Sequence, residues 1–277
     1  TTAAPNDPLF SAQWALKNTG QNQGTAGIDI NYLPAREVTQ GSSDIIVAVL
    51  DHGTQLDHPD LNVSSKSYDT ETGRSPSQIW GNHGTACSGI ISAKTNNNLG
   101  VAGIAPNCPV MSISNQLMGT SDAPQKRADG FNWAWRNGAS VISNSWRSST
   151  FSELLEDAIQ SAMTNGRNGL GCVVTFSAGN YDSNTVGYPA RSLPDIIVVG
   201  ALSLSGKRKS STTIDNEGWW GSDYGTQLDI MAPGVLIYTT DRTGSVGYVS
   251  GDYMPNFNGT SSACPHVAGV AALILSV

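Results

Sequence analysis

Short apolar runs of strand length recur along this chain, and segments with helical patterns separate them. Residues 44–51 read Asp-Ile-Ile-Val-Ala-Val-Leu-Asp, a pattern typical of a parallel strand that is buried on both faces. Alternation of such strands with helices favours an α/β fold, a three-layer sandwich with a mainly parallel twisted β-sheet flanked by helices. We predict strands near 45–50, 110–114, 141–146, 172–177, 196–200 and 235–238, and helices near 83–92, 126–137, 152–165 and 261–276.

Length and composition limit the domain organisation and the partners. A chain of 277 residues without a charged or Pro/Ser-rich linker is expected to form one domain over residues 1–277. With 22 acidic against 15 basic residues, the net charge is −7, which disfavours nucleic acid and anionic membranes as partners. The basic run Lys207-Arg208-Lys209 is predicted to be a solvated loop. The longest apolar stretch, residues 267–277, is too short for insertion across a membrane.

A hydroxyl group stands where a long apolar helix begins near the C-terminus. Residues 258–272 read Asn-Gly-Thr-Ser-Ser-Ala-Cys-Pro-His-Val-Ala-Gly-Val-Ala-Ala. Ser261 therefore lies at a helix N-terminus, where backbone N–H groups and the helix dipole stabilise a nearby anion. Taken alone, this pattern favours an ordinary N-cap serine. Other segments of the chain favour a nucleophile.

Three further polar side chains lie at the ends of predicted elements. Asp51 ends the first predicted strand, at the edge where open α/β sheets carry functional groups. His83 precedes a segment of small and apolar residues, and Asn180 follows the fourth predicted strand. Acyl transfer by a serine needs a base, a carboxylate that orients the base, and donors for the oxyanion. His83, Asp51 and Asn180 supply one of each for Ser261.

The order of these residues along the chain narrows the class of enzyme. The order Asp, His, Ser is that of subtilisins, whereas α/β-hydrolases have Ser, Asp, His. His266 is the only histidine after Ser261, and it lies in the same predicted helix, where it cannot fold back to act as the base. The motifs around Asp51, His83 and Ser261 resemble the triad segments of subtilisin-like serine proteases, and the resemblance extends over nearly the whole chain.

Several details are similar to the kexin and furin branch of this family. They are Asn6–Phe10 with Gln13-Trp14, His58–Leu61, Cys87 after His83, Ser143–Trp146, and Gly166–Gly171.

The chain departs from the kexin pattern where that branch binds arginine. Kexin-like enzymes have an acidic residue shortly after the Ser-Trp-Gly segment, whereas Arg147 follows Trp146 here. They also have an acidic residue before a Gly-Tyr pair, where this chain has Val186. We therefore expect an uncharged, apolar residue before the scissile bond and no cleavage after paired basic residues. Asp182 is the acid of this loop that could turn into the pocket.

The resemblance implies a serine endopeptidase that binds its peptide or protein substrate in an extended conformation, by pairing with strand-like segments. The enzyme would be secreted or attached to the cell surface and made with an inhibitory propeptide, so residues 1–277 are expected to lack the propeptide and the C-terminal end of the domain. A peptide ligase or macrocyclase on the same triad and an inactive, peptide-binding domain remain alternatives. The expected substrate-binding residues are Ser145, Trp146, Arg147, Ser177, Ala178, Gly179 and Val186.

The resemblance also implies a structural Ca²⁺ ion. Residues 94–101 offer an amide oxygen and carbonyl groups, which suit a hard cation, although a polar turn without metal remains open. A zinc site at His52, Asp57, His58 and Asp60 is not expected, because Pro59 breaks the helical spacing of paired ligands. The implied Ca²⁺ ligands are the side chains of Asp7, Asp60 and Asn97 and the carbonyl groups of Lys94, Leu99 and Val101.

Four cysteines leave the disulfide pairing open. Cys87 resembles a free cysteine that family members keep beneath the catalytic histidine, and we interpret it as a packing residue. Cys264 is expected to be buried in its helix. Cys108 and Cys172 either pair or stay free.

Overall fold

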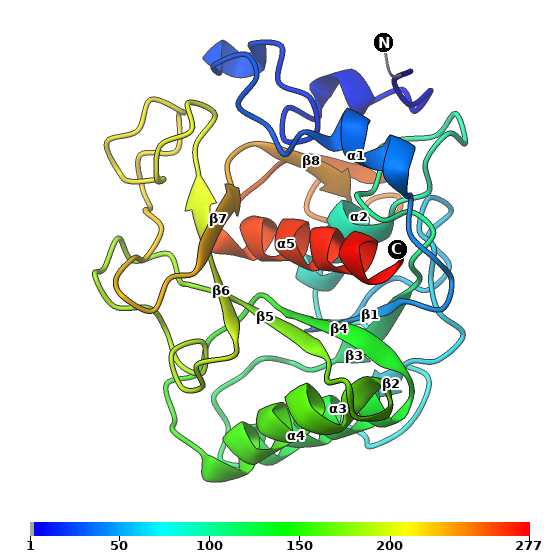
Figure 1. Cartoon of the computed structure of the whole chain (residues 1–277), viewed down its shortest axis with the longest axis vertical. Coiled ribbons are helices and arrows are strands. Elements are labelled where there is room, and N and C mark those ends of the chain that lie inside the picture. Colours follow the sequence, from blue (N-terminus) through cyan, green and yellow to red (C-terminus); the bar gives the residue numbers. More distant parts are fainter. Residues whose placement is uncertain (1–2) are drawn as a thin grey trace.

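A seven-stranded parallel sheet forms the middle of three layers in the computed structural model, which describes residues 3–277 (Figure 1). The strand order is β2-β3-β1-β4-β5-β6-β7, and every neighbouring pair is parallel. The predicted α/β three-layer fold is confirmed. The strands are β1 (Ile46–Asp51), β2 (Tyr68–Asp69), β3 (Val110–Ser114), β4 (Ala139–Asn144), β5 (Val173–Ser177), β6 (Ile197–Leu202) and β7 (Ile230–Pro233).

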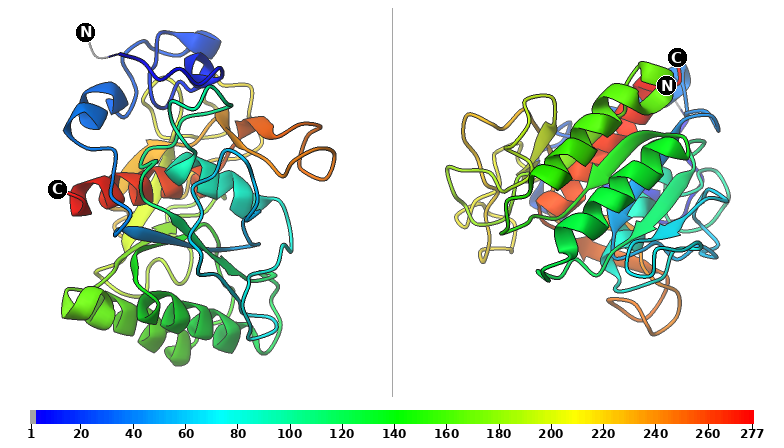
Figure 2. Two further views of the ribbon diagram at one scale, coloured as in Figure 1. Left: turned by 90° about the vertical axis from the view of Figure 1, so that its right-hand side faces the viewer. Right: turned by 90° about the horizontal axis from the view of Figure 1, so that it is seen from below.

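Helices cover both faces of this sheet (Figures 1 and 2). On one face lie α2 (His83–Ser92) and α5 (Thr260–Leu275), with the short α1 (Tyr32–Val38) beyond them; on the other lie α3 (Ala123–Arg136) and α4 (Glu153–Gly169). Among the described residues, no helix is long and apolar enough to cross a membrane.

The apolar run of β1 is explained by two hydrophobic cores. Val47 and Val49 point into the core that α2 and α5 share, whereas Ala48 and Leu50 point into the core beneath α3 and α4. Because successive side chains of a strand face opposite sides, a strand between two cores must be apolar at every position. The strand therefore carries its one charged side chain, Asp51, at its carboxyl end.

The predicted strand near 235–238 exists but does not belong to the main sheet. It is β8 (Ile237–Thr240), which pairs antiparallel with β9 (Tyr253–Phe257). Of the elements that the structure describes, α1, β2, β7, β9 and two 3₁₀ helices, Phe10–Ala12 and Gln21–Gln23, were not predicted. The strands β2 and β7 are short, with 2 and 4 residues, so neither provides enough positions to show a period.

The backbone of α4 leaves the helical conformation at Gly166, in agreement with the helix predicted near 152–165. Gly166 has an extended backbone (ψ 163°), and Arg167 and Asn168 are left-handed. A Cβ atom on Gly166 would lie 2.3 Å from the Cys172 Sγ atom, so the close approach of these segments requires glycine. All four cysteines are free and buried.

The prediction of a solvated basic run is wrong for Lys209, whose side chain is completely buried. Its ammonium group donates hydrogen bonds to the carbonyl oxygens of Ser210 (2.7 Å) and Glu217 (2.8 Å) and to Thr213 Oγ1 (3.0 Å). It also pairs with the buried Asp215 carboxylate at 3.2 Å. A buried charge is tolerated only when it is paired and hydrogen-bonded, and the loop after Lys209 supplies these partners.

Candidate active site

Asp51 and His83 meet at the carboxyl edge of the sheet. Asp51 ends β1 and is fully buried, and His83 is the first residue of α2. The His83 Nδ1 atom lies 2.9 Å from both carboxylate oxygens of Asp51. A carboxylate in this position holds the proton on Nδ1 and leaves Nε2 as the basic nitrogen of the ring.

The pKa of His83 is set by two opposed effects. Burial of the ring lowers the pKa, whereas the Asp51 carboxylate and Cys87 raise it, and together they bring the pKa well above the ordinary value of 6.5. The imidazolium form is therefore stabilised next to Asp51. A base that gains a proton during a reaction needs this stabilisation.

Ser261 is the second residue of α5 and lies beside the segment that follows β4. Its hydroxyl group donates to the Ser145 carbonyl oxygen at 3.3 Å, and the Ser145 hydroxyl donates to the Ser261 carbonyl oxygen at 2.9 Å. The Cys87 Sγ atom lies 3.6 Å from the Ser261 carbonyl oxygen and 3.7 Å from His83 Nδ1. His83 and Ser261 therefore pack against the same thiol, but the hydrogen bond of the Ser261 hydroxyl goes to Ser145 and not to His83.

Two hydrogen-bond donors, Asn180 Nδ2 and the Ser261 N–H, lie near one position beside Gly259. The Asn180 Oδ1 atom accepts hydrogen bonds from the Thr260 N–H (2.8 Å) and the Thr260 hydroxyl (2.9 Å), so Nδ2 is left as the donor of this amide. A Cβ atom built on Gly259 would lie 3.2 Å from Asn180 Nδ2 and 3.5 Å from the Ser261 nitrogen. With φ at 97°, Gly259 has the backbone conformation that favours glycine. The arrangement suits stabilisation of an oxyanion.

A groove of about 820 Å³ begins where the segments after β4 and β5 lie next to each other. Arg147 and Val186, two of the expected substrate-binding residues, line it, and the aliphatic part of Arg147 packs against Gly187. The Arg147 guanidinium group lies 4.4 Å from the centre of the Tyr181 ring. The groove also carries charged side chains, because Glu156, Arg191 and Asp223 line it.

Other predicted substrate-binding residues are buried. Ser145, Ser177 and Ala178 have little exposed surface, and Gly179 is buried as well. Trp146 is 6% exposed, and its indole N–H donates to the Leu50 carbonyl oxygen at 3.0 Å. The Trp146 side chain is therefore part of the core, and a contact of this residue with substrate would involve its backbone.

The acid that lines the groove is Asp223 and not Asp182, the acid that the sequence suggested. Asp182 does not line the groove but forms an ion pair with Arg208 at 2.5 Å. Asp223 lines the groove and is buried, and burial raises the pKa of its carboxyl group. The sequence around Asp223 contains no motif that would have indicated this position.

The residues of the predicted calcium site lie together. Asn97 Nδ2 donates to Asp60 Oδ1 at 2.7 Å, and the backbone N–H groups of Asn96 and Asn97 donate to the Asp7 carboxylate at 3.0 and 3.2 Å. The Val101 N–H donates to Asp60 Oδ2 at 3.2 Å, and the Lys94 N–H donates to the Asp60 carbonyl oxygen at 2.7 Å. The Leu99 N–H donates to Asn97 Oδ1 at 3.0 Å.

In the part of the chain that the structure describes, the two acidic side chains of the predicted calcium site lack a positive partner. Both Asp7 and Asp60 are buried, and within residues 3–277 neither forms an ion pair. Burial raises the pKa of Asp60 to about 6. Carboxylates are ligands that Ca²⁺ prefers, and in this structure N–H groups of residues 96–101 and the Asn97 amide occupy both of them.

The described residues contain one group of three side chains with metal-ligand spacing, Asp51, His83 and Cys87. Within residues 3–277, the histidines and acids at positions 52–60 form no such group. Burial raises the pKa of the Cys87 thiol, which keeps it protonated, so its environment fits a packing residue rather than a nucleophile.

The chain is similar to known proteins in sequence and in structure. The model of the subtilase family matches residues 42–277. A calcium-dependent protease of Trichormus variabilis is 34% identical over 96% of this chain and 44% of that protein, and Subtilisin NAT of Bacillus subtilis subsp. natto is 37% identical over 84% of this chain and 56% of that protein. A solved protease structure from Pseudoalteromonas arctica has 28% identity and a TM-score of 0.77, covering 98% of this chain and 87% of the other. The chain spans about half the length of the curated relatives it matches.

Proposed function

Because the chain belongs to the subtilase family of serine endopeptidases, we propose that it hydrolyses peptide bonds with Asp51, His83 and Ser261 as its catalytic triad. The observation that carries this proposal is the pair of 2.9 Å contacts between His83 Nδ1 and the buried Asp51 carboxylate, next to Ser261. The chemistry requires an oriented base beside a serine hydroxyl, and this arrangement supports it.

The reaction proceeds through an acyl-enzyme. Ser261 Oγ attacks the peptide carbonyl carbon while His83 Nε2 takes the hydroxyl proton, and Asp51 stabilises the imidazolium that forms. The negative charge that develops on the carbonyl oxygen accepts hydrogen bonds from Asn180 Nδ2 and the Ser261 N–H. His83 then transfers its proton to the leaving amine as the C–N bond breaks, and a water molecule that His83 activates hydrolyses the ester.

For the acyl side of the substrate we propose an uncharged residue before the scissile bond. Arg147 places a cation at the groove, and its aliphatic part together with Val186 and Gly187 forms an apolar wall. A lysine or arginine of the substrate that lies against this wall would meet the Arg147 cation, while Glu156 and Asp223 line other parts of the same groove. The buried segments that contain Ser145 and Gly179 would contact the extended backbone of the peptide.

We further propose that Ca²⁺ binds to Asp7, Asp60 and Asn97 and to carbonyl groups of Lys94, Leu99 and Val101. The ion would neutralise the two buried carboxylates and tie the segment before α1 to the loop after α2. This role is structural, since the site is built from residues other than the triad. Calcium dependence is stated for the relative from Trichormus variabilis by its name, which supports the proposal.

Secretion or attachment at the cell surface and synthesis with an inhibitory propeptide remain proposals that rest on the family resemblance. If these proposals hold, the protein is made as a precursor that loses an N-terminal segment during export.

The activity is tested with an internally quenched peptide that has an apolar residue before the cleaved bond. Mass spectrometry of the products should find two fragments with a free carboxylate and a free amine, and the Ser261→Ala variant should produce neither. If the products contain a new amide bond with an added amine, the ligase alternative holds instead. A folded wild-type chain that leaves the peptide intact contradicts both.

A further inference from the structure

The turn that carries Asn180 depends on residues outside the triad motifs. Asn180 follows β5, and its side-chain oxygen is bound by Thr260. These bonds orient the amide group. The position of its donor nitrogen also depends on the backbone of residues 179–183.

Asp223 contacts this backbone on both sides of Asn180. Its N–H donates to the Gly179 carbonyl oxygen at 2.8 Å, and its Oδ1 atom accepts hydrogen bonds from the N–H groups of Tyr181 and Ser183, both at 2.9 Å. The Asp223 residue is 1% exposed. A Cβ atom on Gly179 would lie 2.1 Å from Asp223 Oδ2, so glycine at position 179 allows the carboxylate to lie against the turn.

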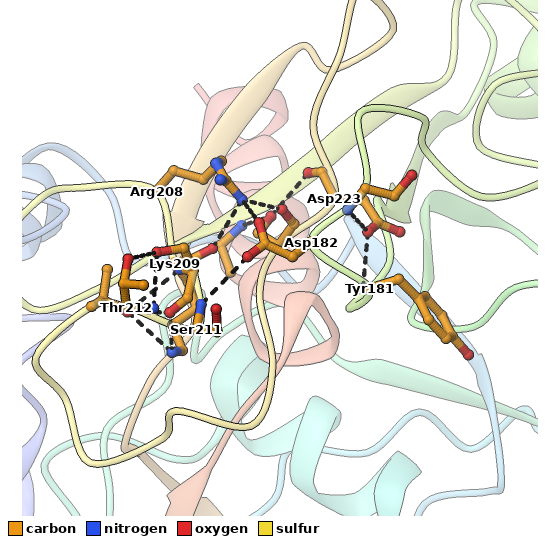
Figure 3. Close-up of polar contacts among 12 residues, drawn as sticks. Tyr181, Asp182, Arg208, Lys209, Ser211, Thr212 and Asp223 are labelled. Carbon is orange, nitrogen blue, oxygen red and sulfur yellow. Dashed lines mark hydrogen bonds and ion pairs between the residues drawn. The ribbon is translucent and has the colours of Figure 1, made fainter.

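An ion pair holds the same turn from a second direction (Figure 3). Arg208 binds the Asp182 Oδ1 atom at 2.5 Å, and Asp182 Oδ2 accepts a hydrogen bond from the Ser211 N–H at 3.4 Å. Arg208 also donates to the Ser222 carbonyl oxygen at 2.7 Å. The backbone N–H of Asp182 donates to the Gly221 carbonyl oxygen at 2.9 Å. The segment 221–223 and the turn are thus joined through both backbone and side chains.

We infer that Asp223 is a positioning residue for the oxyanion donor Asn180, acting through the backbone of residues 179–183, with the Arg208–Asp182 ion pair as a second support. The inference rests on the proposed function, because it gives Asn180 the role of an oxyanion donor.

The physical reason is the steep dependence of such catalysis on geometry. An oxyanion donor must lie within hydrogen-bonding distance of the point where charge develops, and a displacement of about 1 Å can cost about 100-fold in rate. Hydrogen bonds from N–H groups to a carboxylate are stronger than those between neutral groups. A buried carboxylate that binds two N–H groups of one turn is therefore suited to fix the turn.

The test is a double-mutant cycle that combines Asn180→Ala with Asp223→Ala, measured as kcat and KM on the quenched peptide. Asp223→Ala should lower kcat by about 10- to 100-fold, with KM changed by less than about threefold. Asp223→Asn retains an acceptor oxygen and should recover most of kcat. In the Asn180→Ala background, Asp223→Ala should cause no further loss beyond about threefold, because its effect is transmitted through Asn180.

A merely structural role gives a different result. If Asp223→Ala lowers kcat by the same factor in both backgrounds, or if Asp223→Asn is as impaired as Asp223→Ala, the inference is overturned while the proposed function stands. If Asn180→Ala itself leaves kcat unchanged, both the oxyanion role and this inference are wrong. Circular dichroism at the assay temperature establishes that each compared variant is folded.

Asp229→Ala is the matched control. Asp229 Oδ2 also accepts a hydrogen bond from a backbone N–H, that of Val198, at 2.8 Å, but this bond joins the β6 and β7 region and not the Asn180 turn. The kcat of Asp229→Ala should stay within about twofold of the wild-type value. A loss as large as that of Asp223→Ala would show that any missing carboxylate in this part of the molecule impairs turnover, and would overturn the inference.

Discussion

Thr260 binds the side-chain oxygen of Asn180 twice, through its N–H at 2.8 Å and its hydroxyl at 2.9 Å. Because Asn180 lies in the turn after β5 and Thr260 begins α5, these bonds fix the amide relative to Ser261. The amide nitrogen is then the group available to an oxyanion.

Replacement of Asn180 by alanine should therefore lower kcat by about 10² to 10³ with little change in KM, because the lost hydrogen bond forms in the transition state. Thr260→Val removes one of the two bonds to Asn180 and should have a smaller effect in the same direction. Steady-state kinetics on one peptide measure both. A large rise in KM at unchanged kcat would assign Asn180 to substrate binding instead.

The pH dependence of kcat/KM should reflect the environment of His83. The neutral imidazole is the active form, so activity is lost as the pH falls through the pKa of His83, which Asp51 and Cys87 raise well above 6.5 against the effect of burial. The acidic midpoint should lie above pH 6.5 in the wild type. Asp51→Asn should move it to lower pH and reduce kcat by roughly 10⁴. A midpoint that does not move in Asp51→Asn would contradict the ion-pair assignment.

A second histidine predicts a pH dependence of stability. His266 is buried, and it bonds through Nδ1 to the Ser262 carbonyl oxygen at 2.7 Å; burial lowers its pKa to about 4. The folded protein holds this ring neutral, so its contribution is fully present above the ordinary pKa of 6.5. Stability should fall between pH 6.5 and 4, by up to about 3 kcal/mol.

Urea unfolding at pH 7 and at pH 4 measures this change, in the Ser261→Ala background to prevent self-digestion. His266→Gln cannot titrate and should lose about 3 kcal/mol less between the two pH values. Equal losses with and without His266 would refute the assignment.

Removal of calcium should destabilise the protein without altering the triad. A chelator should lower the melting temperature, and added Ca²⁺ should restore it, because the buried Asp7 and Asp60 carboxylates would otherwise lack a cation. Asp60→Asn should abolish the response, whereas Asp57→Asn, at an exposed carboxylate nearby, should retain it. Melting curves of Ser261→Ala that are identical with and without chelator would count against the site.

Specificity should depend on the charge at position 147. The wild type is expected to cleave peptides with leucine or phenylalanine before the scissile bond and to cleave those with arginine poorly. Arg147→Glu should raise kcat/KM for the arginine peptide by about tenfold or more, because the charge that faces the substrate is reversed. A library of peptides that differ at this one position provides the measurement. A wild-type preference for arginine would exclude the proposed pocket.

Sequence patterns predicted the elements that have a strong period or a continuous apolar run, such as β1, β3 and α2. They also indicated His83 and Ser261, because a helix N-terminus and small neighbouring residues are local signals. Asp223 and the burial of Lys209 were missed, since each depends on contacts between segments distant in sequence or on the closure of an irregular loop. Hydrogen bonds between distant segments leave neither a periodic pattern nor a motif in the sequence.

Asp182 illustrates the same limit. Sequence places it in the loop after Asn180, but its direction is decided by Arg208, which lies 26 positions later in the chain. The ion pair turns the carboxylate away from the groove, and Asp223, from another segment, lines the groove instead.

The central claim is that His83 activates Ser261, and labelling with a fluorophosphonate probe tests it most directly. Mass spectrometry should locate one adduct on Ser261 in the wild type, and the His83→Ala variant should be labelled far more slowly although it is folded. Failure of the folded, calcium-loaded wild type to react, or equal labelling of the two proteins, would contradict the account.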